Sequence, residues 1–199
     1  MNKAGVRDYK AFALDILSEV RDKPISFEVF SDDFKEMERQ ANEISSWAEN
    51  VYVKIPVTNT QRVPSFPLIA RLSSQNIKLN VTAIMTANQV RQVAKSLAPS
   101  VPSYVSVFAG RIADTGRDPL PIMKESLEYL KSSPTAELIW ASPRELYNII
   151  QANEIGCQII TSTNDIIKKL DQIGYDLEDF SLDTVKMFHS DARAAGYSL

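Results

Sequence analysis

The chain has 199 residues, of which 44% are hydrophobic and 24% are charged, proportions typical of a globular protein with one sizeable core. Its net charge of −3 provides no broad basic field, so we expect neither nucleic acid nor a membrane surface as a partner. Cys157 is the only cysteine, which excludes an internal disulfide framework and fits a reducing cytoplasm.

Helical and extended segments alternate along the chain. Apolar side chains recur every four residues at Phe12, Ile16 and Val20, which predicts a helix over about 7–22 that Pro24 ends. Apolar runs predict strands at 25–30, 50–55, 77–84, 104–108, 137–141 and 157–161. The segments between and after them predict helices at 31–48, in part of 59–74, and at 86–98, 120–132, 143–153, 164–170 and 182–195.

Two helix starts carry specific signals. Ser31-Asp-Asp opens the second helix, with Glu36 as a capping-box partner. Pro143 falls in the first turn of the helix predicted at 143–153, a position where proline is favoured.

Strands separated by amphipathic helices imply a parallel sheet, either doubly wound or closed as a (β/α)8 TIM barrel. Each predicted strand carries a polar residue near its carboxyl end. In a barrel these ends converge at one mouth, where such enzymes place their chemistry, and this favours the barrel. The residues are Glu28, Lys54, Asn80 with Thr82, Ser106, Ser142 and Thr161.

Lys54 lies within an apolar strand, where burying an ammonium group is costly. It either points outward beneath a helix or is a desolvated amine able to attack a carbonyl. Its position in the sequence alone does not distinguish these two interpretations. Glu28 is either a solvated edge residue or a carboxylate that moves protons.

Arg111 and Arg144 each follow a strand, and together they would form a fork for a phosphate. His189 is expected to be solvated, without a metal-ligand cluster.

Several linked motifs resemble the transaldolases, in order and at suitable spacing. The resemblance is strongest to the small transaldolases, which include the fructose 6-phosphate aldolases. It implies a (β/α)8 barrel, sugar-phosphate substrates of the pentose phosphate pathway, and Schiff-base chemistry without metal or organic cofactor. The motifs are Val53-Lys-Ile-Pro-Val-Thr58, Asn80-Val-Thr82, Ser106-Val-Phe-Ala-Gly-Arg-Ile112, Ala141-Ser-Pro-Arg144 and Gly156-Cys-Gln-Ile-Ile-Thr161.

The resemblance also implies roles for individual residues. Lys54 matches the Schiff-base lysine, and Glu28 with Thr82 matches the groups that orient the catalytic water. The substrate-binding positions are Asn80, Ser106, Phe108, Arg111, Ser142 and Arg144, with the two arginines on the phosphate. Pro143 departs from the family pattern, which usually has phenylalanine there.

Glu28 and Phe108 are the residue types of transaldolases, whereas fructose 6-phosphate aldolases typically carry glutamine and tyrosine there. This favours transfer of a dihydroxyacetone unit to an aldose phosphate. A cleaving aldolase and a sugar-phosphate-binding relative without catalysis remain the alternatives.

Family members open with a strand bearing a Leu-Asp-Thr-Ala-like motif and a second strand ending in Thr-Thr-Asn-Pro. Met1-Asn-Lys-Ala-Gly resembles the family segment that comes just after the second motif, so we expect six of the eight barrel strands in a single domain over 1–199. The first strand supplies the family's acid–base aspartate, so we expect weak turnover from this chain. The C-terminal helix at about 182–195 is expected to pack over the barrel mouth or on a neighbouring subunit of a homo-oligomer.

Overall fold

The computed structural model describes residues 8–197. The chain divides into two compact units, Met1–Thr161 and Ser162–Leu199, and each is described by itself. Within the described range, no helix combines the length and the apolar composition that crossing a membrane requires.

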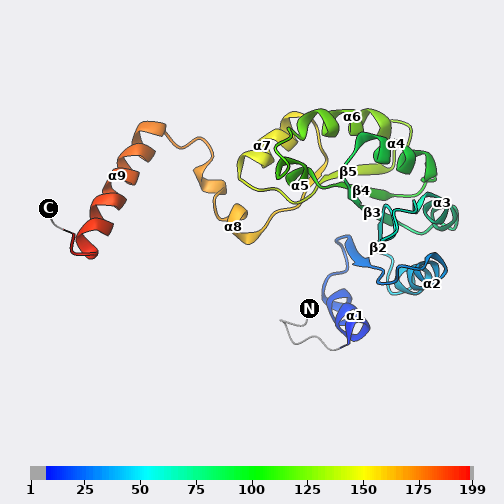
Figure 1. The fold of residues 1–199 in the computed structure, drawn as a ribbon. Coiled ribbons are helices and arrows are strands. Elements are labelled where there is room, and N and C mark those ends of the chain that lie inside the picture. The colour runs from blue at the N-terminus through cyan, green and yellow to red at the C-terminus, as the bar shows by residue number, and fades with distance from the viewer. Residues whose placement is uncertain (1–7, 198–199) are drawn as a thin grey trace. The chain divides into compact units, whose positions relative to one another are not determined.

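The first unit is built on a six-stranded parallel sheet whose strands lie in chain order (Figure 1). Its strands are β1 (Ile25–Glu28), β2 (Val51–Pro56), β3 (Leu79–Ile84), β4 (Ser103–Val107), β5 (Ala136–Trp140) and β6 (Ile159–Ile160). Its helices are α1 (Tyr9–Glu19), α2 (Phe34–Ser45), α3 (Phe66–Ser74), α4 (Ala87–Ser96), α5 (Ala109–Ala113), α6 (Leu120–Leu130) and α7 (Tyr147–Glu154).

The order of the strands decides between the two sheet architectures. A doubly wound sheet reverses its strand order at a switch point, which places helices on both faces. Here β1 to β6 follow one another without reversal, and right-handed crossovers then place every connecting helix on the same face. Helices α3, α4 and α6 follow one another around the outer side of the strands (Figure 1). The sheet curls as a half-barrel, so the prediction of a partial TIM barrel is confirmed.

The two faces of the sheet have different chemistry because side chains alternate along each strand. The outer face is apolar: Val53, Leu79, Val105 and Leu138 are fully buried in the main core. The inner face carries the polar residues of the same strands, with a small apolar cluster around Tyr52, Tyr104, Ile139 and Ala141. Burial of the outer face therefore holds the strands in place and leaves the inner face free for a site.

The second unit consists of α8 (Asn164–Ile167), the short 3-10 helix η2 (Leu170–Gln172) and α9 (Leu177–Ala194). Helix α9 begins five residues before the predicted start at 182, because the side chain of Asp176 accepts hydrogen bonds from the first-turn N–H groups of Glu178 and Asp179. The prediction of one domain over 1–199 stays a prediction.

Two local expectations were wrong, and one short helix was not expected. The carboxylate of Glu36 forms no capping box; it pairs with Arg39, while Asp33 caps α2 alone. Helix α7 starts at Tyr147, so Pro143 lies in the loop before it. The five-residue α5 was not expected, because so short an apolar segment has no helical period to detect.

Candidate functional site

A row of inner-face residues crosses four neighbouring strands at one height. The register pairs Glu28 with Lys54, Lys54 with Asn80, and Asn80 with Tyr104. Neighbouring strands lie about 4.8 Å apart, so the pairing fixes the spacing of these side chains independently of the loops. The three polar members were predicted from their strand-end positions, and the sheet brings them together.

The amine of Lys54 faces the inner side of the sheet. Its neighbours Val53 and Ile55 are fully buried on the opposite face, which excludes the alternative of a lysine lying beneath a helix. Lys54 Nζ lies 3.6 Å from Glu28 Oε2, an ion pair longer than a hydrogen bond. The lysine side chain is 31% exposed and the glutamate side chain is 47% exposed, so a small ligand has access to both groups.

Asn80 is held by hydrogen bonds from both ends of its amide. Its Nδ2 donates to Ser26 Oγ at 2.9 Å, and its Oδ1 accepts from Ser106 Oγ at 2.8 Å. Because the amide donates one of these bonds and accepts the other, the two bonds define which way the amide faces. Ser26, two residues before Glu28, was missed by sequence analysis although period two places both side chains on one face.

Thr82 occupies a break in the sheet. The pairing of β3 with β4 shifts register between Val81 and Ile84, and Ala83 adopts a left-handed φ of 60°. Bulges of this kind redirect a side chain and often adjoin active sites. Thr82 is buried, and its hydroxyl has no hydrogen-bond partner among the described residues. A buried hydroxyl of this kind is usually satisfied by a water or a ligand.

A cavity of about 450 Å³ opens over these inner-face residues. The rings of Tyr104 and Tyr52 stack beside it with centroids 4.2 Å apart, and burial raises the pKa of Tyr104. The cavity therefore combines an apolar floor with converging amine, amide and hydroxyl groups, as ligand sites commonly do. Its lining is Pro24, Ser26, Lys54, Asn80, Thr82, Tyr104, Ser106, Phe108, Ile139, Ala141, Ser142, Ile159 and Thr161.

The predicted phosphate arginines follow β4 and β5 and do not line this cavity. The guanidinium carbon of Arg111 lies 5.0 Å from the ring centroid of Phe108, which does line it. Arg144 forms an ion pair with Asp114, the residue that ends α5. Glu28 is also outside the cavity lining, and it reaches the site through Lys54.

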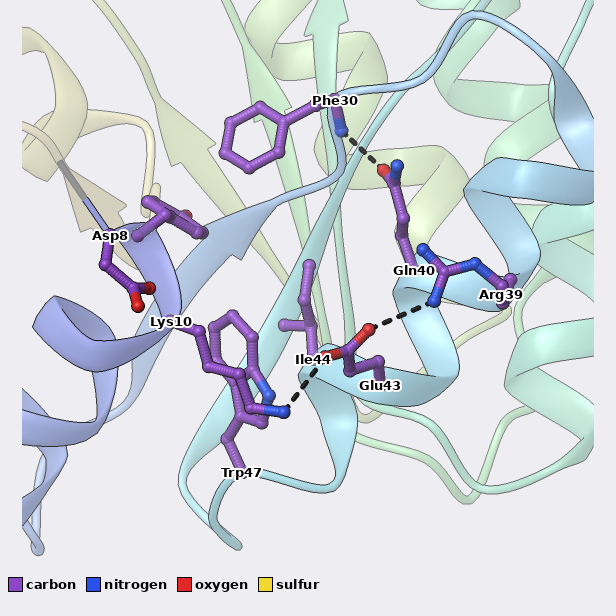
Figure 2. A pocket seen from close by; sticks show the side chains of 9 residues that line it. Asp8, Lys10, Phe30, Arg39, Gln40, Glu43, Ile44 and Trp47 are labelled. Atoms are coloured by element: carbon purple, nitrogen blue, oxygen red, sulfur yellow. Dashed lines mark hydrogen bonds and ion pairs between the residues drawn. The ribbon is translucent and has the colours of Figure 1, made fainter.

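A second cavity, of about 410 Å³, lies between α1 and α2 (Figure 2). Its charged side chains neutralise one another, because Glu43 pairs with both Lys10 and Arg39. The amide oxygen of Gln40 accepts the backbone N–H of Phe30, as the dashed line in Figure 2 shows. These polar groups have partners already, so this cavity is a poor candidate for chemistry.

Comparison with known proteins assigns the family. A family model described as Transaldolase/Fructose-6-phosphate aldolase matches residues 6–199. The chain belongs to this family. The resemblance seen in the strand-end motifs is thereby confirmed over essentially the whole chain.

Curated relatives of the transaldolase family agree with this assignment. A probable transaldolase of Methanococcus maripaludis is 36% identical over 165 residues, which cover 82% of this chain and 73% of that protein. A probable transaldolase of a Thermoanaerobacter species is 32% identical over 184 residues, which cover 92% of this chain and 79% of that protein. Among solved structures, a mandelate oxidase variant aligns with a TM-score of 0.51 at 12% identity over 75% of this chain; the match spans about half of that protein (51%) and shows a shared fold alone.

Within this transaldolase-family fold, the sequence motifs located most of the candidate site and missed three residues. Ser26 and Tyr104 lie two positions before Glu28 and Ser106, so strand period was the signal that could have found them. Asp114 had no such signal, because it ends the short helix α5, outside any strand, and reaches Arg144 across thirty positions of sequence.

Proposed function

We propose that this chain is a transaldolase-type enzyme that forms a Schiff base on Lys54 and transfers a dihydroxyacetone unit from a ketose phosphate to an aldose phosphate. The observation that carries the proposal is the contact of Lys54 Nζ with the Glu28 carboxylate at 3.6 Å, beside a cavity that also exposes the amide of Asn80. Family membership supports the same chemistry.

The first step needs an unprotonated amine. Glu28 is the carboxylate that pairs with Lys54, so in the proposal it accepts a proton from the ammonium group. The amine then attacks the C2 carbonyl of the ketose, and loss of water gives an iminium ion that acts as an electron sink. Asn80, held by Ser26 and Ser106, would bind a substrate hydroxyl beside this carbon.

Proton movements in the later steps need a positioned water. The Thr82 hydroxyl, which has no partner within residues 8–197, and the Glu28 carboxylate flank Lys54 on the neighbouring strands β3 and β1. In the proposal they hold that water between them. When the C4 hydroxyl passes its proton through this water to the Glu28 carboxylate, the C3–C4 bond breaks and the aldose phosphate leaves, while the electron pair is stored as an enamine.

Transfer is completed when the enamine adds to the aldehyde carbon of a second aldose phosphate, after which water hydrolyses the iminium and frees Lys54. Arg111 and Arg144 would anchor the phosphate, so that binding energy remote from the reacting carbons positions them. Ser142 and Phe108, which line the cavity, each lie within three residues of one of these arginines.

The decisive experiment is reductive trapping of the full chain with borohydride and dihydroxyacetone. We expect the mass of one reduced dihydroxyacetone unit on Lys54 and none after Lys54→Met. Lys78→Met is the matched control, because Lys78 directly precedes the adjacent strand β3 and its amine donates to the backbone oxygen of Glu49. Adduct on other lysines with Lys54 unmodified would reject the proposal.

A second variant separates the two roles assigned to Glu28 and Lys54. Glu28→Gln keeps the size of the side chain and removes its charge. If Glu28 moves protons, exchange of the dihydroxyacetone unit between fructose 6-phosphate and an aldose phosphate should slow by about 10²–10⁴-fold, the usual range for general acid–base catalysis. Trapping on Lys54 should persist after long incubation. A rate equal to that of the parent chain would remove Glu28 from this role.

We further propose that the active form is a homo-oligomer. Helix α9 carries large apolar side chains that are half or more exposed, including Leu177, Val185 and Phe188. Exposed apolar surface of this kind often marks an interaction site. Light scattering of the full chain should give a mass of at least two copies, and a monomer at micromolar concentration would refute the proposal.

A further inference from the structure

We infer that Asp114 is a positioning residue for phosphate recognition: it holds Arg144 by one edge of its guanidinium group and leaves the other edge for a substrate phosphate. The inference rests on the proposed function, because it concerns the phosphate end of the same substrate. The observation behind it is a two-point contact between loops that follow neighbouring strands β4 and β5.

The contact uses a defined part of the arginine. Arg144 Nε donates to Asp114 Oδ1 at 2.9 Å, and Arg144 Nη2 donates to Asp114 Oδ2. A guanidinium group has five N–H donors in a rigid plane. The carboxylate takes two of them, so three remain, on Nη1 and on Nη2. One on Nη1 and one on Nη2 lie side by side along the second edge of the plane and match the geometry of a phosphate.

The loop that carries Arg144 is fixed to the short helix α5, which carries Arg111. The N–H of Gly110 donates to the carbonyl of Ala141, and the carbonyl oxygen of Ser142 lies where a side chain on Gly110 would be. Asn148 accepts the backbone N–H of Arg144 through its side-chain oxygen. Backbone and side chain of Arg144 are therefore both held before any ligand arrives.

Charge supports this arrangement. Hydrogen bonding by Arg144, and the more distant charge of Arg111, hold the pKa of Asp114 below its ordinary value, so the carboxylate stays ionised. The two guanidinium groups of Arg111 and Arg144 and the carboxylate of Asp114 together carry a net charge of about +1. The ion pair between Arg144 and Asp114 is exposed, so it contributes little to folding stability. Its main effect is to orient the guanidinium group of Arg144.

Two opposing effects make the test informative. If Asp114 orients Arg144, removing it weakens phosphate binding. If Asp114 only repels the phosphate by its charge, removing it strengthens binding. We expect Asp114→Ala to raise the dissociation constant for inorganic phosphate about tenfold, the size of one lost charged hydrogen bond. Asp114→Asn keeps one acceptor oxygen and should give an intermediate value.

A double-mutant cycle shows whether Asp114 acts through Arg144. In an Arg144→Ala background, Asp114→Ala should not weaken phosphate binding further. Asp118→Asn is the matched control, because Asp118 is a nearby exposed carboxylate whose side chain accepts the backbone N–H of Leu120. It should leave phosphate binding unchanged.

The measurements are isothermal titration of the full chain with inorganic phosphate and borohydride trapping with unphosphorylated dihydroxyacetone. Trapping on Lys54 should be equal in the parent chain and in Asp114→Ala. Unchanged or tighter phosphate binding in Asp114→Ala, or an equal loss with and without Arg144, would overturn the inference. Absence of trapping in the parent chain would instead reject the Schiff-base proposal, and the phosphate measurements would still decide the role of Asp114.

Discussion

Gly110 gives the sharpest structural prediction, because helix propensity and packing predict opposite signs for Gly110→Ala. The residue lies in α5, and within a helix alanine is favoured over glycine by about 1 kcal/mol. An added Cβ would however lie 1.5 Å from the carbonyl oxygen of Ser142, where ordinary contact begins at 3.4 Å. The added Cβ would be 1.9 Å too close (3.4 − 1.5) to a backbone atom, so no side-chain rotation could relieve the overlap.

The backbone that would have to move is already constrained. Ser142 has a left-handed φ of 58° and precedes Pro143, which restricts it further. We therefore expect Gly110→Ala to lower the free energy of unfolding by about 3 kcal/mol, the upper part of the range for overpacking. Arg144 would be displaced with the loop, so phosphate binding should weaken as well.

Urea unfolding followed by circular dichroism measures the first effect, and titration with inorganic phosphate measures the second. Gly116→Ala is the matched control: its φ of 76° disfavours alanine, but apart from its chain neighbours no described residue lies within 4 Å of the added Cβ. It should cost about 1–2 kcal/mol, the penalty of the left-handed conformation alone. A smaller loss for Gly110→Ala than for Gly116→Ala would refute the packing argument.

Other parts of the molecule give three more expected outcomes. Ser26→Ala removes the acceptor for Asn80, so urea unfolding should show a loss of about 1 kcal/mol and trapping of dihydroxyacetone should slow; two unchanged values would contradict the role of this bond. Burial raises the pKa of Cys157 above its ordinary 9.0, so iodoacetamide should label it slowly at pH 7 until urea unfolds the chain. Because the folded pKa is the higher one, this thiol's contribution to stability is complete below pH 9 and is lost as the pH rises further; a Cys157→Ser chain with the same alkaline loss would contradict this. Helix α9 should resist limited proteolysis, and its rapid removal from otherwise intact protein would show that it does not dock on protein.

The sequence predicted the elements of the fold better than their arrangement. Apolar runs located all six strands, because short apolar runs between helical segments are typical of the strands of a parallel sheet. It did not separate a barrel from a doubly wound sheet, since both alternate strand and helix. Strand order makes that distinction, and strand order depends on contacts between distant segments that no local pattern records.

The site shows the same division between local and distant information. Lys54 was singled out as a charged residue in an apolar strand, and its role, like that of Asn80, was predicted from the resemblance to the transaldolases. The bond between Arg144 and Asp114 could not be predicted, because exposed charged residues in loops are common and most have no fixed partner. The start of α7 was placed too early for a related reason: Pro143 suits a first helical turn and a loop equally well.

The register that aligns Glu28, Lys54 and Asn80 has a consequence for how such a protein can change. The spacing of these groups is set by main-chain pairing between strands, which almost any apolar residue on the outer face can support. Replacement of amino acids in the helices and loops is therefore tolerated far more readily than a gain or loss of a single residue inside a strand. One such insertion would turn Lys54 toward the apolar core. A relative is 30% identical over 171 residues, and we expect length differences among such relatives to lie in the connections between strands and helices.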